Sequence, residues 1–321
     1  MALIFLNFWL IRLTKTKDNA MHNLRNKFDS ILSIVKHSLT NFLDNNGNLP
    51  RPGPKPRFSD AEVIALDLLA ESLMITSENY LFKFLHNNLK DQFPYLIERS
   101  RYNRRKRELF SLIEQVRIEL VKHLIGQEDT FLIDSMPLPI VKLSRAPRAR
   151  ICKEESSRAP DHGYCASQNQ KYYGYKFHAT STIDGVITHF TITKAHVHDI
   201  EYLQEIRDFY PGCTILGDRA YLSDPLQLEL FENDRLMLIT PMRRNQRNYR
   251  KQPSLFRRLR KRIETVFSQF CDQFQIQKNY AKTFLGLATR ILSKITAFTL
   301  LQYLNKYKFK NKLNHVKHVL V

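Results

Sequence analysis

The most informative stretch of the sequence is Thr214-Ile215-Leu216-Gly217-Asp218-Arg219-Ala220-Tyr221. Three β-branched or apolar residues, a glycine and a carboxylate predict a short buried strand that delivers Asp218 to its carboxyl end. The same pattern occurs earlier, in Thr130-Phe131-Leu132-Ile133-Asp134-Ser135. Catalytic groups gather at the carboxyl ends of strands in open α/β sheets, so we expect Asp134 and Asp218 to lie close together. Two neighbouring carboxylates repel each other unless a cation lies between them, and the pair therefore indicates a metal site.

The composition indicates a globular protein with a polyanionic partner. A chain of 321 residues can form one large domain and a smaller one, each with its own core. Fifty Lys and Arg against 31 Asp and Glu give a net charge of +19, which makes nucleic acid the leading partner. The alternative is a basic surface without a function. The 4 Cys residues have no CxxC spacing, so we expect reduced thiols and a cytoplasmic protein rather than a disulfide framework.

The N-terminal segment is apolar but does not predict a membrane protein. Its run MALIFLNFWLIRL is too short to span a bilayer and lacks the basic leader and cleavage site of a secretory signal. A helical pattern begins only after Met21, so residues 1–20 are expected to be an extension outside the folded unit.

Residues 21–126 read as a helical DNA-binding domain. Apolar residues recur at helical spacing from Asn23 to Phe42, and a Pro-rich and Gly-containing linker follows over residues 45–57. Ser59-Asp60-Ala61-Glu62 is a capping box, and Ser77 is expected to start a second helix. The third helix is strongly basic, which favours a helix-turn-helix-like unit whose last helix enters a DNA groove. The expected DNA contacts there are Arg104, Arg105, Lys106 and Arg107. A helical packing domain without a DNA role is the alternative.

Residues 127–305 predict a mixed α/β domain. Phe131–Asp134, Tyr173–Thr180 and Val186–Thr193 are expected to form an antiparallel trio, with a tight turn at Asp184-Gly185. Residues 144–157 are basic and poor in apolar residues, which predicts a loop. Helices then alternate with the strands at 214–216 and 236–240, and this order matches a ribonuclease H-like architecture. Residues 306–321 are interpreted as a basic C-terminal tail.

A third carboxylate follows a strongly basic segment. Residues 242–262 contain ten basic residues and no acidic one. The segment leads into an amphipathic helix, and stepping by three or four residues places Glu264 on its basic face with Arg260. A simple ion pair with Arg260 is one interpretation of Glu264. We favour a third metal ligand, because two strand-end aspartates precede it. The expected phosphate contacts around it are Arg243, Arg244, Arg247, Arg257 and Lys261.

Five motifs in order carry a resemblance to a known family. They are Leu132-Ile133-Asp134-Ser135, Tyr173-Gly174-Tyr175-Lys176-Phe177-His178, His198-Asp199, Gly217-Asp218-Arg219-Ala220-Tyr221 and Arg260-Lys261-Arg262-Ile263-Glu264-Thr265-Val266-Phe267. Together they resemble bacterial insertion-sequence transposases of the DDE class, most of all the insertion sequence 982 family. The resemblance implies that Asp134, Asp218 and Glu264 bind metal and that Arg260 assists on the transferred strand. Related transposases often carry Tyr at the position of Arg257 and a basic residue at that of Cys271. Both are missing here, so the resemblance assigns no role to these two positions.

The expected function is therefore DNA transposition. Three carboxylates suit Mg²⁺ or Mn²⁺, and paired ions activate the attacking oxygen and stabilise the leaving one in phosphoryl transfer. The expected partners are double-stranded DNA, both element ends and target, and further copies of the chain in a homo-oligomer. A nuclease that cuts without joining and an inactive DNA-binding derivative are the alternatives.

The remaining histidines receive weaker interpretations. His196 and His198 are expected on one side of a strand, where they could ligate a transition metal. We favour the alternative, in which the pair is structural or hydrogen-bonds a neighbouring loop. His178 is expected to be a strand residue near the site rather than a ligand.

Overall fold

The computed structural model describes residues 24–246 and 249–318. The expected extension at 1–20 and the expected DNA contact Arg247 lie outside these residues. The described chain forms two compact units, 24–116 and 117–318, and the boundary falls within helix α5 (Phe110–Leu124). The domain limits expected at residues 126 and 305 stay predictions.

The first unit is helical. It contains a helix over residues 24–38, α2 (Asp60–Ser72), α3 (Glu78–Asn88), the short 3₁₀ helix η1 (Lys90–Gln92), α4 (Arg99–Glu108) and the first part of α5. The capping box at the start of α2 is confirmed, because Ser59 and Glu62 bond reciprocally to each other's backbone N–H groups. Ser77 caps α3 as predicted, accepting from the Tyr80 N–H at 3.3 Å.

The second unit is built on a mixed six-stranded sheet. Its strands are β1 (Thr130–Val141), β2 (Asp161–Cys165), β3 (Gln170–Thr182), β4 (Ile187–Lys194), β5 (Thr214–Leu216) and β6 (Met237–Ile239). Their order is β2-β3-β1-β5-β6, and β4 also pairs with β3. The predicted trio β1, β3 and β4 is antiparallel, and β5 and β6 extend the sheet in parallel with β1. This is the ribonuclease H-like arrangement expected from the sequence.

Two features of the sheet differ from the sequence expectation. β1 is one continuous strand through Pro137 and Pro139, because β5 pairs with it only over Thr130–Leu132 and leaves the later edge open. β2 follows the basic loop and was not predicted. It pairs with the start of β3, and a Cβ on Gly163 would lie 2.7 Å from the Cβ of Ala195, so only glycine permits this close approach.

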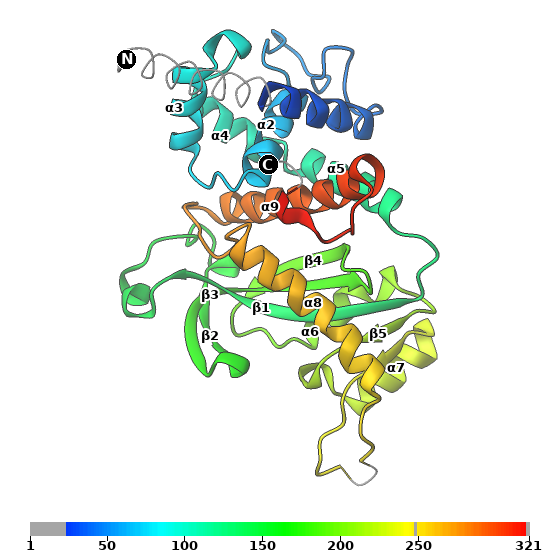
Figure 1. Ribbon diagram of the computed structural model, residues 1–321. Helices are drawn as coiled ribbons and strands as arrows, with labels where there is room; N and C mark the ends of the chain where they lie inside the picture. The colour runs from blue at the N-terminus through cyan, green and yellow to red at the C-terminus, as the bar shows by residue number, and fades with distance from the viewer. Residues whose placement is uncertain (1–23, 247–248, 319–321) are drawn as a thin grey trace, which may run out of the picture. The chain divides into compact units, whose positions relative to one another are not determined.

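Helices cover both faces of the sheet. α6 (Glu201–Ile206) and α7 (Asp224–Asp234) share a buried cluster with Phe131 and Ile133 of β1. On the other face, Phe177 of β3 makes edge-to-face contacts with Phe267 and Phe270 of α8 (Ser254–Asp272), which crosses the sheet in Figure 1. Successive residues of a strand point to opposite faces, so Asp134 faces α8 and Ser135 faces the α6 side.

Helix α9 (Phe284–Leu304) is the core helix of this unit. Among the described residues it is the one helix long and apolar enough to cross a membrane. However, 83% of its apolar window is buried inside the protein, as in the core helix of a globular protein. Its Phe298 packs against Phe270 of α8, with ring centroids 5.0 Å apart.

Candidate active site

The two aspartates lie side by side because their strands are parallel neighbours. Asp218 follows the end of β5, but Asp134 lies within β1, which continues to Val141. The strand end expected at Asp134 is therefore corrected. In the ladder between β1 and β5, the last paired residues are Leu132 and Leu216. Asp134 and Asp218 each follow two residues later, so they occupy equivalent positions beyond the paired segment. Neighbouring strands are about 4.8 Å apart, which places the two carboxylates within strong electrostatic range.

The turn after β5 holds Asp218 in place. Its carboxylate accepts from the Ala220 N–H at 2.8 Å and caps the short 3₁₀ helix η6 (Arg219–Tyr221). Gly217 lets this turn approach β1, because an added Cβ would lie 3.1 Å from the side chain of Ile133. Tyr221 lies beneath the turn, fully buried, and its hydroxyl has no hydrogen-bond partner among the described atoms.

α8 supplies the third carboxylate and a guanidinium. Its apolar stripe is buried against the sheet and α9, and this leaves the opposite face of the helix open to solvent. Glu264 is exposed on that face. Arg260 is half-buried one turn earlier, and its Nε has no hydrogen-bond partner in the described part of the chain.

The pKa of Asp134 responds to the charges of Asp218, Glu264 and Arg260. Burial, together with the carboxylates of Asp218 and Glu264, raises this pKa to about 7. The Ser135 N–H, which donates to Asp134 Oδ1 at 2.8 Å, and the positive charge of Arg260 act in the opposite direction. Asp218, Glu264 and Arg260 therefore all lie within electrostatic reach of Asp134.

The charges at this site fit a divalent cation, although the carboxylates do not form a closed cage. Among the described residues, no three His, Cys, Asp or Glu side chains lie close enough to hold a metal ion. Mg²⁺ keeps several waters and usually needs only one or two carboxylates plus a substrate phosphate. Two other carboxylates oppose the ionisation of the half-buried Asp134 carboxyl, and a bound divalent cation would stabilise its charged form.

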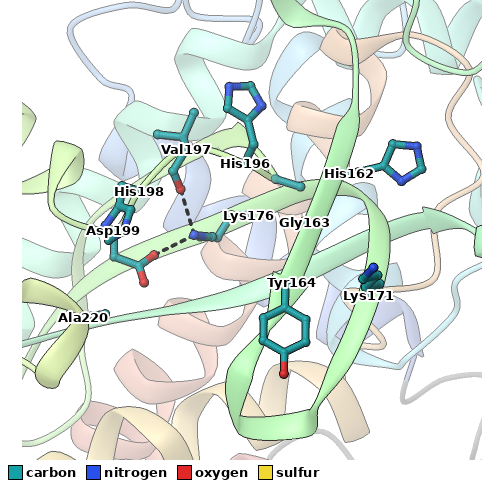
Figure 2. Close-up of a pocket in the computed structure, with 11 residues that line it drawn as sticks. His162, Gly163, Tyr164, Lys171, Lys176, His196, Val197, His198, Asp199 and Ala220 are labelled. Atoms are coloured by element: carbon teal, nitrogen blue, oxygen red, sulfur yellow. Dashed lines mark hydrogen bonds and ion pairs between the residues drawn. The ribbon is translucent and has the colours of Figure 1, made fainter.

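A second polar cluster lies beside the aspartates, and its role was not predicted from the sequence. The Ser135 hydroxyl donates to Asp199 Oδ1 at 2.9 Å, and the Lys176 ammonium lies 3.0 Å from the same oxygen. Lys176 also donates to the Val197 carbonyl at 2.8 Å, as Figure 2 shows. The His198-Asp199 motif is the part of the sequence that points to this cluster.

The cluster forms one wall of a surface pocket of about 670 Å³ (Figure 2). The polar residues that line it are His162, Tyr164, Lys171, Lys176, His196, His198 and Asp199. The two histidines lie in the turn after β4, so the strand expected there is corrected. His196 bonds to the neighbouring segment at Asp161, with Nδ1 and Oδ2 3.0 Å apart.

His178 is a buried strand residue, as expected. It lies at the centre of the sheet next to Asp199, and burial lowers its pKa to about 4, so the imidazole is neutral at pH 7. Its Nε2 lies 2.9 Å from the hydroxyl of Thr193 on β4.

Two of the basic residues expected to contact DNA are turned into the first unit. Lys106 is 3% exposed and pairs with Asp67 and Glu78 at 3.1 and 2.8 Å. Arg105 pairs with buried Asp60 at 2.6 Å and also donates to the Phe58 carbonyl. The expectation that Arg105 and Lys106 contact phosphate is corrected, because both side chains are already bound to carboxylate or carbonyl groups inside the first unit.

The other expected DNA contacts lie nearer the surface. Arg107 is half-buried, with its Nε 3.4 Å from the Asn103 carbonyl, and the remaining side chains are exposed. The exposed ones are Arg104, Arg243, Arg244, Arg257 and Lys261.

One family model matches the chain, the Transposase DDE domain, over residues 125–300. This match covers more than half of the chain and includes all four residues of the candidate site. The chain belongs to the DDE transposase family. No curated protein and no solved structure matches it. Transposases of this family act on DNA and generally use divalent metal ions.

Proposed function

We propose that this transposase cuts DNA at the ends of its own insertion sequence and joins the freed 3′-hydroxyl to target DNA. The observation that carries the proposal is the pairing of Asp134 and Asp218 on parallel neighbouring strands, with Glu264 and Arg260 in the same electrostatic site. Within the DDE class, the five ordered motifs favour the insertion sequence 982 family.

The proposed metal ligands are Asp134, Asp218 and Glu264. Mg²⁺ or Mn²⁺ would lower the pKa of a water or 3′-hydroxyl and would stabilise the charge on the leaving oxygen. The protein itself contributes the half-buried carboxylate pair, which favours a bound cation, and the guanidinium of Arg260 beside it. The guanidinium of half-buried Arg260 would donate to a phosphate oxygen of the strand held at the site.

Basic side chains around the site would hold the DNA backbone without reading its sequence. In the second unit these are Arg243, Arg244, Arg257 and Lys261. Arg247, which lies outside the described residues, is proposed from the sequence alone. In the first unit Arg104 and Arg107 remain candidates within α4.

We propose that this helical unit recognises the element ends in a helix-turn-helix-like manner. Two ends must be brought together for transposition, so a homo-oligomer on chromosomal DNA in the bacterial cytoplasm is the proposed working form.

Product analysis separates this function from its two alternatives. The substrate is a labelled duplex carrying the element's own end, mixed with a supercoiled target plasmid and Mg²⁺. Joined product is expected and supports the transposase. Cleaved ends that never join would indicate a nuclease, and tight binding without cleavage would indicate an inactive DNA-binding derivative.

A further inference from the structure

An apolar groove with a basic rim lies within the first unit. It has a volume of about 530 Å³ and is formed by the second half of α3, by η1 and by the segment that leads into α4. Six of its twelve lining residues are apolar. The exposed cations Lys83, Lys90 and Arg99 also line it, against a single acid, Glu98. The groove therefore suits a ligand that is both apolar and acidic.

The apolar lining of this groove is held in place by the core of the unit. Phe93 packs edge to face on Phe28, with ring centroids 5.0 Å apart, and Phe82 packs on Tyr102 at 5.1 Å. Leu85 between them in the sequence is fully buried. A ligand thus meets a preformed surface and does not have to order it. Phosphate backbone is bound by polar and charged groups, so such an apolar lining favours a protein ligand over DNA.

Helix α7 of the second unit carries a surface with the complementary character. Its Leu228 and Phe231 are 58% and 44% exposed, and they lie on one side of the helix because they are three residues apart. Asp224 and Glu232 lie four residues before and after Leu228, and both are exposed. The open side of α7 is therefore an apolar stripe with a carboxylate near each end.

This acidic surface is unusual in so basic a chain. Residues 200–235, which include α6 and α7, contain eight acidic and three basic residues in a protein of net charge +19. One of the three, Arg207, is already bound by Glu229 and Asp234, each at 2.8 Å. When two copies approach, most of their faces repel each other, whereas the acidic helix of one attracts the basic groove of the other.

We propose that α7 of one copy docks into the groove between α3 and η1 of a second copy. Leu228 and Phe231 enter the apolar groove, and Asp224 and Glu232 face the rim at Lys83 and Lys90, as amphipathic helices bind in grooves elsewhere. Each copy carries one helix and one groove, so two copies related by a two-fold axis make the contact twice and close a dimer. The inference rests on the proposed function, whose working form is a homo-oligomer, and names the surfaces that pair.

Exchanging the charges of the two surfaces tests this contact. Sedimentation velocity of the full chain over a range of concentrations, in low salt without DNA or metal, should show that the wild type self-associates. K83E/K90E and D224K/E232K should each weaken this association at least about tenfold, because each places like charges at both contacts. An equimolar mixture of the two variants should associate about as tightly as the wild type, because both contacts then join opposite charges.

Two further variants control for net charge and for the apolar contact. K310E/K312E reverses two exposed lysines of the second unit and should associate like the wild type. L228S/F231S changes only exposed side chains of α7 and should associate as weakly as the charge variants. All four substitutions lie at the surface, and unchanged melting curves would show that the variants fold.

The outcomes separate this contact from the other roles of the protein. A monomeric wild type, or a mixture of the two charge variants that stays monomeric, would overturn the proposal. Weaker binding of DNA by K83E/K90E with unchanged self-association would assign the groove to DNA and overturn it as well. The assay contains no DNA, so these results leave the proposed function intact. A wild-type chain that neither cuts nor joins DNA would instead count against that function alone.

Discussion

The Ser135 hydroxyl donates to Asp199 Oδ1 at 2.9 Å and thereby ties the strand residue next to Asp134 to the turn before α6. Lys176 neutralises the same carboxylate from β3 at 3.0 Å. Asp134 and Ser135 point to opposite faces of the sheet, so this contact fixes the backbone from which Asp134 projects.

Replacing Asp199 should therefore impair catalysis without removing a group that touches DNA. Asp199→Ala leaves Ser135 without its acceptor and the half-buried Lys176 without its carboxylate partner, which should cost about 1–3 kcal/mol of unfolding free energy. The joining rate should fall by roughly tenfold, because small displacements of reacting groups are costly. Asp199→Asn, which can still accept from Ser135, should retain more activity. Chemical denaturation and single-turnover joining measure both effects, with exposed Asp208→Ala as the control. Equal rates for Asp199→Ala and wild type would show that the contact does not position Asp134.

Asp134 should make the metal-free protein less stable as the pH rises. Folding raises its pKa from an unfolded value of about 4 to about 7. The folded chain thus holds a proton that the unfolded chain releases, and stability falls as the pH rises through this window. Asp134→Asn should raise the unfolding midpoint by roughly 2–6 °C at pH 8 in metal-free buffer and change it little near pH 4. A thermal scan of Asp208→Asn provides the comparison, and a midpoint gain independent of pH would rule out this origin.

Lys106 should matter for stability rather than for DNA. Lys106→Ala leaves Asp67 and Glu78 without the cation that bridges them, which should destabilise the first unit by about 3–5 kcal/mol. Arg104→Ala removes an exposed charge from the same helix and should cost less than about 0.5 kcal/mol. Its effect should appear instead as a shallower salt dependence of DNA binding. Denaturation and binding titrations of the two variants should give opposite rankings, and a stable Lys106→Ala protein would disprove the inward role.

Arg260 should act on the transferred strand. Arg260→Ala is expected to lower the cleavage rate by roughly 10²-fold, the usual cost of losing one charged donor at a developing charge. Arg258→Ala removes an exposed guanidinium from the same helix and should leave that rate within about threefold. Single-turnover cleavage at saturating DNA separates this effect from weaker binding. Similar losses in both variants would indicate a general electrostatic effect of α8 instead.

The sequence predicted those parts of the molecule that depend on local pattern. The carboxylate after β5, the capping box at Ser59 and the turn at Asp184-Gly185 each follow from residues close together in the chain, and the structure confirms them. The segments that lead to Asp134 and Asp218 have similar sequence patterns, and this similarity alone predicted that they belong to one sheet. The DDE family match agrees with the class of enzyme inferred from the five motifs.

The parts that the sequence did not predict depend on long-range partners. The continuity of β1 through Pro137 and Pro139 depends on where β5 stops pairing, and β2 depends on a partner strand that follows it. Lys106 looks like its basic neighbours in the sequence, and only the packing of α2 and α3 against α4 gives it two carboxylate partners. The Asp199 cluster joins residues from three separate segments, which no local motif specifies.

The most direct test of the central claim is the joining activity of Asp218→Asn. This substitution keeps the shape of the turn and an oxygen acceptor for the Ala220 N–H, but it removes the negative charge proposed to bind metal. With the element's own end, a target plasmid and Mg²⁺, wild type and Asp208→Asn should yield joined product. Asp218→Asn should yield at least about 10³-fold less while binding the DNA end with similar affinity. Joining by Asp218→Asn at the wild-type rate would contradict the account.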